Sequence, residues 1–212
     1  MITSNGLPPA QSGDICILLE PAQEEISGLR RLQRLLQAQY GGRPQQRIHF
    51  TGQRFAPGGV EQLGQIVDAL QERVASLPPF PVHATSLVLA AHPFWGFYVL
   101  RWDLRICRAM QAFSSLVETA LAEAGARPHY PSGGDWNPHV TALEAIPETA
   151  HVLAANGNAP SNRYLYTGRR LVLSQVQPGK QFAIVHTLPL GGSLPPSEPP
   201  PDAGPPASPQ AR

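Results

Sequence analysis

The sequence has few cysteines and almost no net charge. Its two cysteines, Cys16 and Cys107, lie in apolar stretches and lack the CxxC or Cys/His spacing of a metal site. We therefore expect buried free thiols and a reducing, cytoplasmic compartment. The formal net charge is +1, so bulk charge points to neither a nucleic-acid nor a membrane partner, although it is compatible with a local basic cleft.

Long apolar runs and familiar nucleotide motifs are also missing. The longest apolar stretch, LVLAAHPFWGFYVL, is interrupted by His92, Pro93 and Gly96, which favours two strands over a membrane span. The start of the chain, MITSNGLPPAQSGD, is not a secretory signal. A Walker-type phosphate loop and a dinucleotide fingerprint are both absent, which argues against ATP-driven and hydride-transfer chemistry.

Almost all of the basic residues are arginines. Lys180 is the single lysine, beside 15 arginines. Arginine suits bidentate recognition of phosphate. A GC-rich genome would give the same bias, and the two explanations stay open here.

Composition divides the chain into one domain and two tails. Residues 1–13 are polar and are expected to be a loose end, and residues 14–190 form the domain. Residues 191–212 are proline-rich, bury too little apolar surface to offset the entropy of ordering, and are expected to be disordered. This tail is either inert or a polyproline ligand for a partner. We expect a monomer.

Within the domain, strand and helix patterns alternate. Apolar residues at helical spacing predict helices over 22–40 and 60–77, and a third that begins after Asp103 as N-cap and ends at Gly125. A short helix is expected at about 147–155. Strands are expected at 14–21, 47–55, 81–90, 94–102, 137–146, 164–176 and 181–190. The order of elements repeats once, which indicates a duplicated α+β unit.

Two of these strands carry the same motif, His-x-Thr. It stands at His49 and Thr51 in RIHFTGQRF and at His139 and Thr141 in WNPHVTALEA. Side chains two apart in a strand share a face, so each pair projects together, with Gln53 next in line and Arg54 on the opposite face. If the strands are neighbours, two imidazoles and two hydroxyls converge.

Such a quartet is suited to phosphodiester chemistry. Imidazole titrates near pH 6.5, so one ring accepts a proton while the other donates one. Threonine hydroxyls donate hydrogen bonds to phosphate oxygens. His83-Ala84-Thr85 has the same spacing, but no helix follows its strand, so the pair at 49 and 139 is the better candidate.

The two motifs, the 90 residues between them and the closing strands RRLVLSQVQPGKQFAIVHTLPL resemble the two-histidine (2H) phosphoesterase superfamily, in its 2′-5′ RNA ligase-like, 2′,3′-cyclic phosphodiesterase branch. The resemblance covers about residues 14–190. It implies a bilobal α+β fold with two antiparallel sheets around a central cleft and helices outside. It implies catalysis by His49, Thr51, His139 and Thr141, without a metal or other cofactor, on an RNA end or a small cyclic or 2′-5′ nucleotide. Reverse ligation is compatible with the same site.

The position after each threonine departs from the family pattern. Gly52 and Ala142 stand where a larger apolar residue is usual, and because both lie on the face away from the cleft we expect altered packing. The departure keeps an alternative open, a non-catalytic protein that binds RNA ends or nucleotides with a vestigial site. Gln53 and Trp136 are candidate substrate-binding residues, Trp136 by stacking on a base. Arg163, Arg169 and Arg170 line either a basic rim or a solvated sheet edge.

Overall fold

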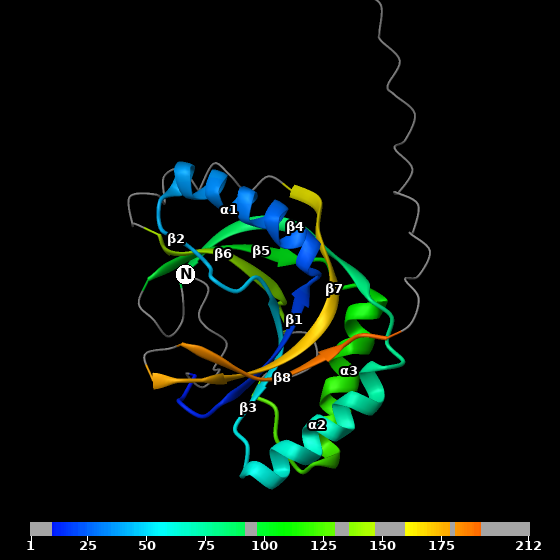
Figure 1. The fold of residues 1–212 in the computed structure, drawn as a ribbon. Helices are drawn as coiled ribbons and strands as arrows, with labels where there is room; N and C mark the ends of the chain where they lie inside the picture. The colour runs from blue at the N-terminus through cyan, green and yellow to red at the C-terminus, as the bar shows by residue number, and fades with distance from the viewer. Residues whose placement is uncertain (1–9, 92–96, 130–135, 147–159, 179–180, 192–212) are drawn as a thin grey trace, which may run out of the picture.

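The computed structural model describes residues 10–91, 97–129, 136–146, 160–178 and 181–191. Eight strands and three α-helices lie in these ranges (Figure 1). The helices are α1 (Ile26–Tyr40), which follows the short 3₁₀ helix η1 (Gln23–Glu25), α2 (Val60–Val74) and α3 (Arg108–Glu123). The strands are β1 (Ile15–Pro21), β2 (Arg43–Pro44), β3 (Phe50–Phe55), β4 (Phe80–Ala91), β5 (Tyr98–Leu104), β6 (His139–Ile146), β7 (Pro160–Val176) and β8 (Phe182–Pro189).

Three predicted helices and seven predicted strands are found in the predicted order, with some bounds shifted, and η1 and β2 were not predicted. The fold is α+β with antiparallel strand pairs throughout. The expected short helix at 147–155 and most of both predicted tails, residues 1–9 and 192–212, lie outside the described residues. Among the described helices, none is both long and apolar enough to cross a membrane.

The start of α3 differs from the prediction. Asp103 is not its N-cap, since it still belongs to β5 and pairs with His139 of β6. The helix begins at Arg108 after Cys107. The strand continues because Leu104 is buried, so the chain leaves the sheet only after it. The predicted end is confirmed at Gly125, which adopts the left-handed φ of 67° that favours glycine.

The strands join into one sheet in the order β1-β3-β6-β5-β4-β7-β8, and β1 also pairs with β7. Two separate sheets were expected. The two halves are joined at two places. β7, which is 17 residues long, pairs through its first half with β4 and through its second half with β1. The second join is the pairing of β3 with β6. β3, β1, β7 and β8 thus make one half of the sheet, and β6, β5, β4 and β7 the other.

The helices lie on the outside of this curved sheet, α1 on one side and α2 with α3 on another (Figure 1). Each buries one stripe of apolar side chains, as the periodicity predicted. In α2 the stripe is Ile66, Leu70 and Val74, one turn apart. These residues join the main core, which includes Phe113 of α3 and the strand residues Phe50 and Val140.

Both cysteines are free thiols, as expected, but only one is buried. Cys16 lies in a small second cluster with Leu18, Val172 and Val176, and burial raises the pKa of its thiol to about 12. A thiol with so high a pKa is unreactive at neutral pH. Cys107 is partly exposed at the N-cap of α3.

Candidate active site

The two His-x-Thr motifs lie at the starts of neighbouring strands. His49 immediately precedes β3, which begins at Phe50 and not at residue 47 as expected, and His139 is the first residue of β6. Phe50 of β3 pairs with Val140 of β6 in an antiparallel register. If the register continues by one residue to either side of this pair, His49 lies beside Thr141 and Thr51 lies beside His139. Phe50 and Val140 are fully buried in the core, so the four motif side chains project from the opposite face of the sheet, and all four are partly exposed.

The histidines occupy diagonal positions of this four-residue patch. Diagonal neighbours in an antiparallel pair are about 7–8 Å apart between Cα atoms. The charge of His139 lowers the pKa of His49, which agrees with this proximity. Each histidine therefore has the hydroxyl residue of the other motif beside it, and the patch has an approximate local twofold arrangement.

Each ring is held by the same hydrogen bond. His49 Nδ1 is 2.9 Å from the carbonyl oxygen of Arg47, and His139 Nδ1 is 3.1 Å from that of Asn137. A carbonyl only accepts, so both Nδ1 atoms carry hydrogen and both Nε2 atoms of the neutral rings are free to accept a proton. In both motifs the acceptor is the residue two positions before the histidine, and this fixes one tautomer in both.

Burial lowers the pKa of both histidines to about 4. For His49, the charge of Arg47 lowers the pKa further and the bond to the Arg47 carbonyl opposes the shift. For His139, the charge of Arg101 adds to the lowering and the bond to Asn137 opposes it. Neither ring keeps the value near 6.5 assumed from the sequence, so both are neutral at pH 7 in the free protein.

Two charged residues of β5 flank the second motif. Arg101 pairs with Thr141 and Asp103 pairs with His139, so both face the same side as the motifs. Arg101 Nε lies 2.9 Å from Asp103 Oδ1, and both side chains are about one-fifth exposed. This pair was not predicted from the sequence, although two charges two residues apart in an otherwise apolar strand are a usable signal.

A β-bulge corrects two expectations about the first motif. The register of β3 against β1 shifts between Leu18, which pairs with Thr51, and Ile17, which pairs with Gln53. The extra residue turns Gln53 to the side of Ile17, where it is 2% exposed, so it does not share the face of Thr51. The bulge turns Arg54 to the other face of the strand, which is the face that was expected for Gln53.

Because Arg54 pairs with Cys16, it faces the same side as Thr51 and Leu18. It is nonetheless 2% exposed, and its Nε lies 3.6 Å from Oδ2 of the buried carboxylate of Asp14. Arg54 thus forms a buried ion pair with Asp14, and the face predicted for it was wrong. The strand alternation that supported both predictions holds only as far as the bulge.

The structure gives a packing reason for the small residue after Thr51. A Cβ at Gly52 would lie 2.5 Å from Cε1 of Phe113, whose ring packs edge-on against Phe50 at 5.6 Å between centroids. The glycine lets α3 approach β3 closely. Ala142 is fully buried at the matching place on β6. Both residues face away from the motifs, as expected.

The remaining candidates, Trp136 and His83, have the following surroundings. Trp136 is partly buried and packs against the main core. His83 lies on β4, separated from β6 by β5, and its ring packs against that of Tyr164 at 5.6 Å. Within the described residues, no three His, Cys, Asp or Glu side chains are grouped as a metal site.

Comparison with solved structures identifies the fold. No family model matches the chain, and no curated protein does. A crystal structure of a phosphoesterase superposes with a TM-score of 0.59 at 14% identity, over 86% of this chain and 100% of the other. The structure of E. coli LigT complexed with 3′-AMP has a TM-score of 0.59 at 13% identity, over 85% and 99%. The fold is that of LigT.

A protein of Thermus thermophilus is similar to the same extent, with a TM-score of 0.55 at 17% identity over 84% of this chain and 98% of the other. The match to LigT thus extends over most of the chain, as the resemblance from the two motifs implied. At these identities the likeness concerns the fold alone. Any role for His49 and His139 must therefore be argued from the local geometry of this chain.

Proposed function

We propose that this protein is a phosphodiesterase that hydrolyses a 2′,3′-cyclic phosphate or a 2′-5′ phosphodiester of RNA or a small nucleotide. The proposal is supported by the pairing of Phe50 with Val140, the middle residues of the two His-x-Thr motifs, and by the hydrogen bonds from both Nδ1 atoms to backbone carbonyls. The LigT-like fold supports it, and LigT itself has been crystallised with 3′-AMP.

The reaction uses both rings in opposite protonation states. The Nε2 of one neutral histidine removes a proton from a water molecule, whose oxygen forms a bond to phosphorus. The bond from phosphorus to a ribose oxygen breaks, and the protonated second histidine gives its proton to that oxygen. A cyclic phosphate is thereby opened to a phosphomonoester, and the two histidines exchange protonation states.

The threonines and Arg101 assist without transferring a proton. The Thr51 and Thr141 hydroxyls donate hydrogen bonds to the non-bridging phosphate oxygens, where negative charge develops. Arg101 lies beside Thr141 and adds positive charge there. A bound phosphate anion also raises the pKa of the nearby histidines, so the acid becomes protonated more readily in the complex than in the free protein.

The direct test is hydrolysis of adenosine 2′,3′-cyclic phosphate by the purified chain in excess chelator. We expect turnover that chelator does not reduce, and its loss in His49→Ala. Activity that chelator abolishes and an added divalent metal restores would contradict this mechanism. Binding of RNA with a cyclic-phosphate end, without turnover under any condition, would establish the alternative of a vestigial site.

A further inference from the structure

A cavity beside the first motif contains more positive than negative charge. It has a volume of about 240 Å³, and its charged lining residues are three arginines, Arg30, Arg47 and Arg170, and one carboxylate, Glu20. Ile48, which separates Arg47 from His49, also lines it. The backbone that forms this cavity therefore runs directly into the candidate site.

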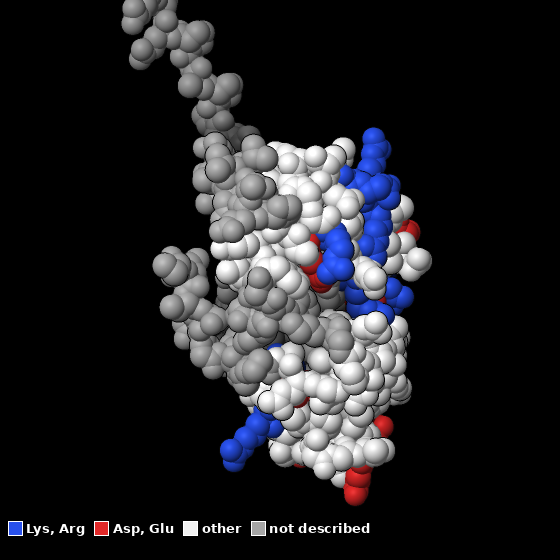
Figure 2. Space-filling model, turned by 90° about the vertical axis from the view of Figure 1, so that its left-hand side faces the viewer, with Lys and Arg blue, Asp and Glu red and all other residues white. Residues whose placement is uncertain are grey.

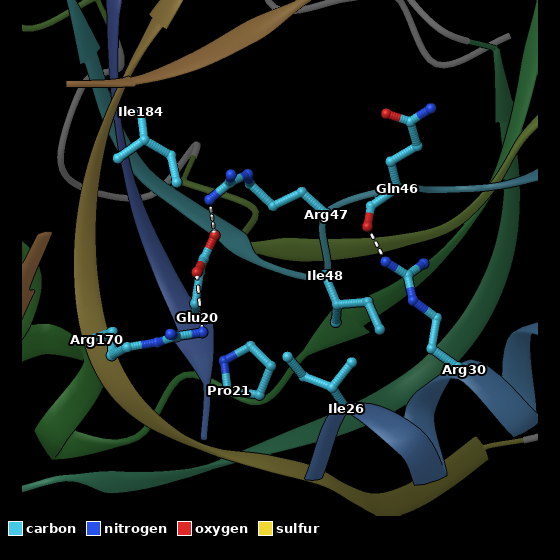
Figure 3. Close-up of a pocket in the computed structure, with 9 residues that line it drawn as sticks. All are labelled: Glu20, Pro21, Ile26, Arg30, Gln46, Arg47, Ile48, Arg170 and Ile184. Carbon is cyan, nitrogen blue, oxygen red and sulfur yellow. Dashed lines mark hydrogen bonds and ion pairs between the residues drawn. The ribbon is translucent and has the colours of Figure 1, made fainter. Parts of the chain in front are cut away.

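Glu20 lies between two of the arginines (Figure 3). Arg47 Nη1 donates a hydrogen bond to Glu20 Oε1, and Arg170 Nη2 donates to Glu20 Oε2 at 3.4 Å. The Glu20 side chain is 9% exposed, whereas the Arg47 and Arg170 side chains are 27% and 36% exposed. A guanidinium has five N–H donors, and Glu20 engages one nitrogen of each, so donors remain for a second anion.

Arg30, on α1, also lines the cavity, and its guanidinium group donates hydrogen bonds to one side chain and two backbone carbonyls. Its Nη1 donates to Gln33 Oε1 at 2.9 Å and to the Gln45 carbonyl at 2.5 Å, and its Nη2 donates to the Gln46 carbonyl (Figure 3). These bonds leave its charge uncompensated. One carboxylate against three guanidinium groups leaves the cavity two positive charges in excess.

The segment that contributes Arg30 and Arg47 carries further positive charge. Residues 26–60 contain six arginines and no Asp or Glu. Arg31 and Arg34 of α1 are exposed, and Lys and Arg side chains gather on one side of the face in Figure 2, in its upper half. A field of this kind raises the local concentration of anionic substrates.

The register sets the distance from the cavity to the motif patch. Leu18 of β1 pairs with both Thr51 and Val172, and two residues further along β1 Glu20 pairs with Arg170. Two residues of a strand span about 7 Å, roughly the separation of successive phosphates along an extended nucleic-acid strand. Glu20 and Arg170 are on the same face as Thr51.

From this geometry we infer that Arg47 and Arg170 form a subsite for a second phosphate, the one on the 5′ side of the ribose whose 2′,3′ oxygens lie at the histidines. The inference builds on the proposed function and narrows its substrate class. The favoured substrate is a nucleotide with a 5′-phosphate or an oligonucleotide end, and a nucleoside cyclic monophosphate is a poor one. Bidentate guanidinium groups are suited to such a phosphate.

The kinetic test compares two substrates that differ in one group, adenosine 2′,3′-cyclic phosphate with and without a 5′-phosphate. We expect the 5′-phosphorylated form to have a kcat/KM about tenfold or more higher, mainly through a lower KM. In Arg170→Met and in Arg47→Met this ratio should fall toward one, and Arg170→Lys should restore part of it. A ratio of one in the unaltered protein, with both substrates turned over, would overturn the subsite and leave the proposed function intact.

A binding measurement makes the test independent of turnover. Calorimetry with adenosine 3′,5′-bisphosphate and adenosine 3′-monophosphate should show about tenfold tighter binding of the bisphosphate, and loss of this difference in Arg170→Met. Arg34→Gln, which removes an exposed arginine of α1 outside the cavity, should leave the difference unchanged. Equal loss in Arg34→Gln would show general electrostatic attraction only and would overturn the subsite.

Glu20→Gln separates the subsite from a purely structural ion-pair network. If the arginines bind phosphate, removal of the competing carboxylate should leave the preference for the bisphosphate equal or stronger. If the network only holds β1 to β7, the same change should lower the unfolding midpoint and reduce binding of both ligands equally, which counts against the subsite. Thermal unfolding of every variant shows whether it is folded.

Discussion

The segment around His49 and the segment around His139 orient their rings in the same way. In each, Nδ1 bonds to the carbonyl two residues earlier, and burial lowers the pKa to about 4. Their surroundings differ. His49 lies next to Arg47 and the arginine cavity, whereas His139 lies beside Asp103 and near Arg101. Local ring geometry is thus duplicated while the charge around each ring is not, and this gives each histidine a distinct electrostatic environment.

The largest effect is expected from removing either ring. His49→Ala and His139→Ala should each lower kcat on a cyclic nucleotide by about 10² to 10⁴, since each removes one partner of an acid–base pair. The double variant should be little worse than either single one, because the pair acts as a unit. His83→Ala is the matched control, with the same motif on β4. If it is as damaging as His49→Ala in a folded protein, the wrong motifs have been paired.

Smaller losses are expected from the hydroxyls. Thr51→Val and Thr141→Val each remove a hydrogen bond to a charged group, which contributes about 1.5–3 kcal/mol, or roughly 10- to 100-fold in kcat. Thr141→Val should be the milder change because Arg101 lies beside it as a second donor. Steady-state kinetics on one cyclic nucleotide would decide this. A larger loss at Thr141 than at Thr51 would show that Arg101 does not reach the phosphate.

The residues that follow the threonines differ in how tightly they are packed. Gly52→Ala should destabilise the fold by about 1–3 kcal/mol, because its Cβ would lie 2.5 Å from Cε1 of Phe113. Ala142→Gly should cost about 0.5–1 kcal/mol through backbone entropy. Gly64→Ala is the control, since its Cβ meets nothing within 4 Å in mid-helix and should stabilise by up to about 1 kcal/mol. Urea unfolding measures all three, and a neutral Gly52→Ala would contradict the packing argument.

The smallest effect expected is a displacement of the pH profile. With both pKa values lowered to about 4, the protonated acid becomes rarer as pH rises, so kcat/KM should fall about tenfold per pH unit above pH 6. Arg101→Gln removes a charge that lowers the pKa of His139, so that pKa rises. If His139 is the acid, the descending limb moves to higher pH by up to about one unit.

The matched variant for the other ring is Arg47→Gln, because the charge of Arg47 lowers the pKa of His49. Whichever variant moves the descending limb identifies the acid. A kcat/KM profile whose descending limb lies above pH 6.5 in the unaltered protein would contradict the lowered pKa values.

Periodicity was sufficient to predict the helices and most strands, since each element buries one regular stripe of apolar residues. The two motifs were likewise predictable, because a strand places His and Thr two apart on one face. Gln53 and Arg54 were misplaced since a bulge depends on the neighbouring strand and on Phe113 from α3, which local sequence does not specify. Arg101 and Glu20 were missed, and Arg170 was predicted only as part of a basic rim or a solvated edge, because strand pairing brings these residues together from distant parts of the chain.

The pairing of β1 with β7 has a consequence for how the chain folds during synthesis. Ile15 pairs with Gln175, and Glu20 with Arg170, so the first strand gains its main partner only when the end of the domain has been translated. Contacts so distant in sequence slow folding. Until β7 is made, β1 can pair with β3 along one edge only, and its other, apolar edge is exposed to aggregation. The arginine cavity is completed in the same late step, so ribosome-bound chains that lack β7 carry the motif histidines without it.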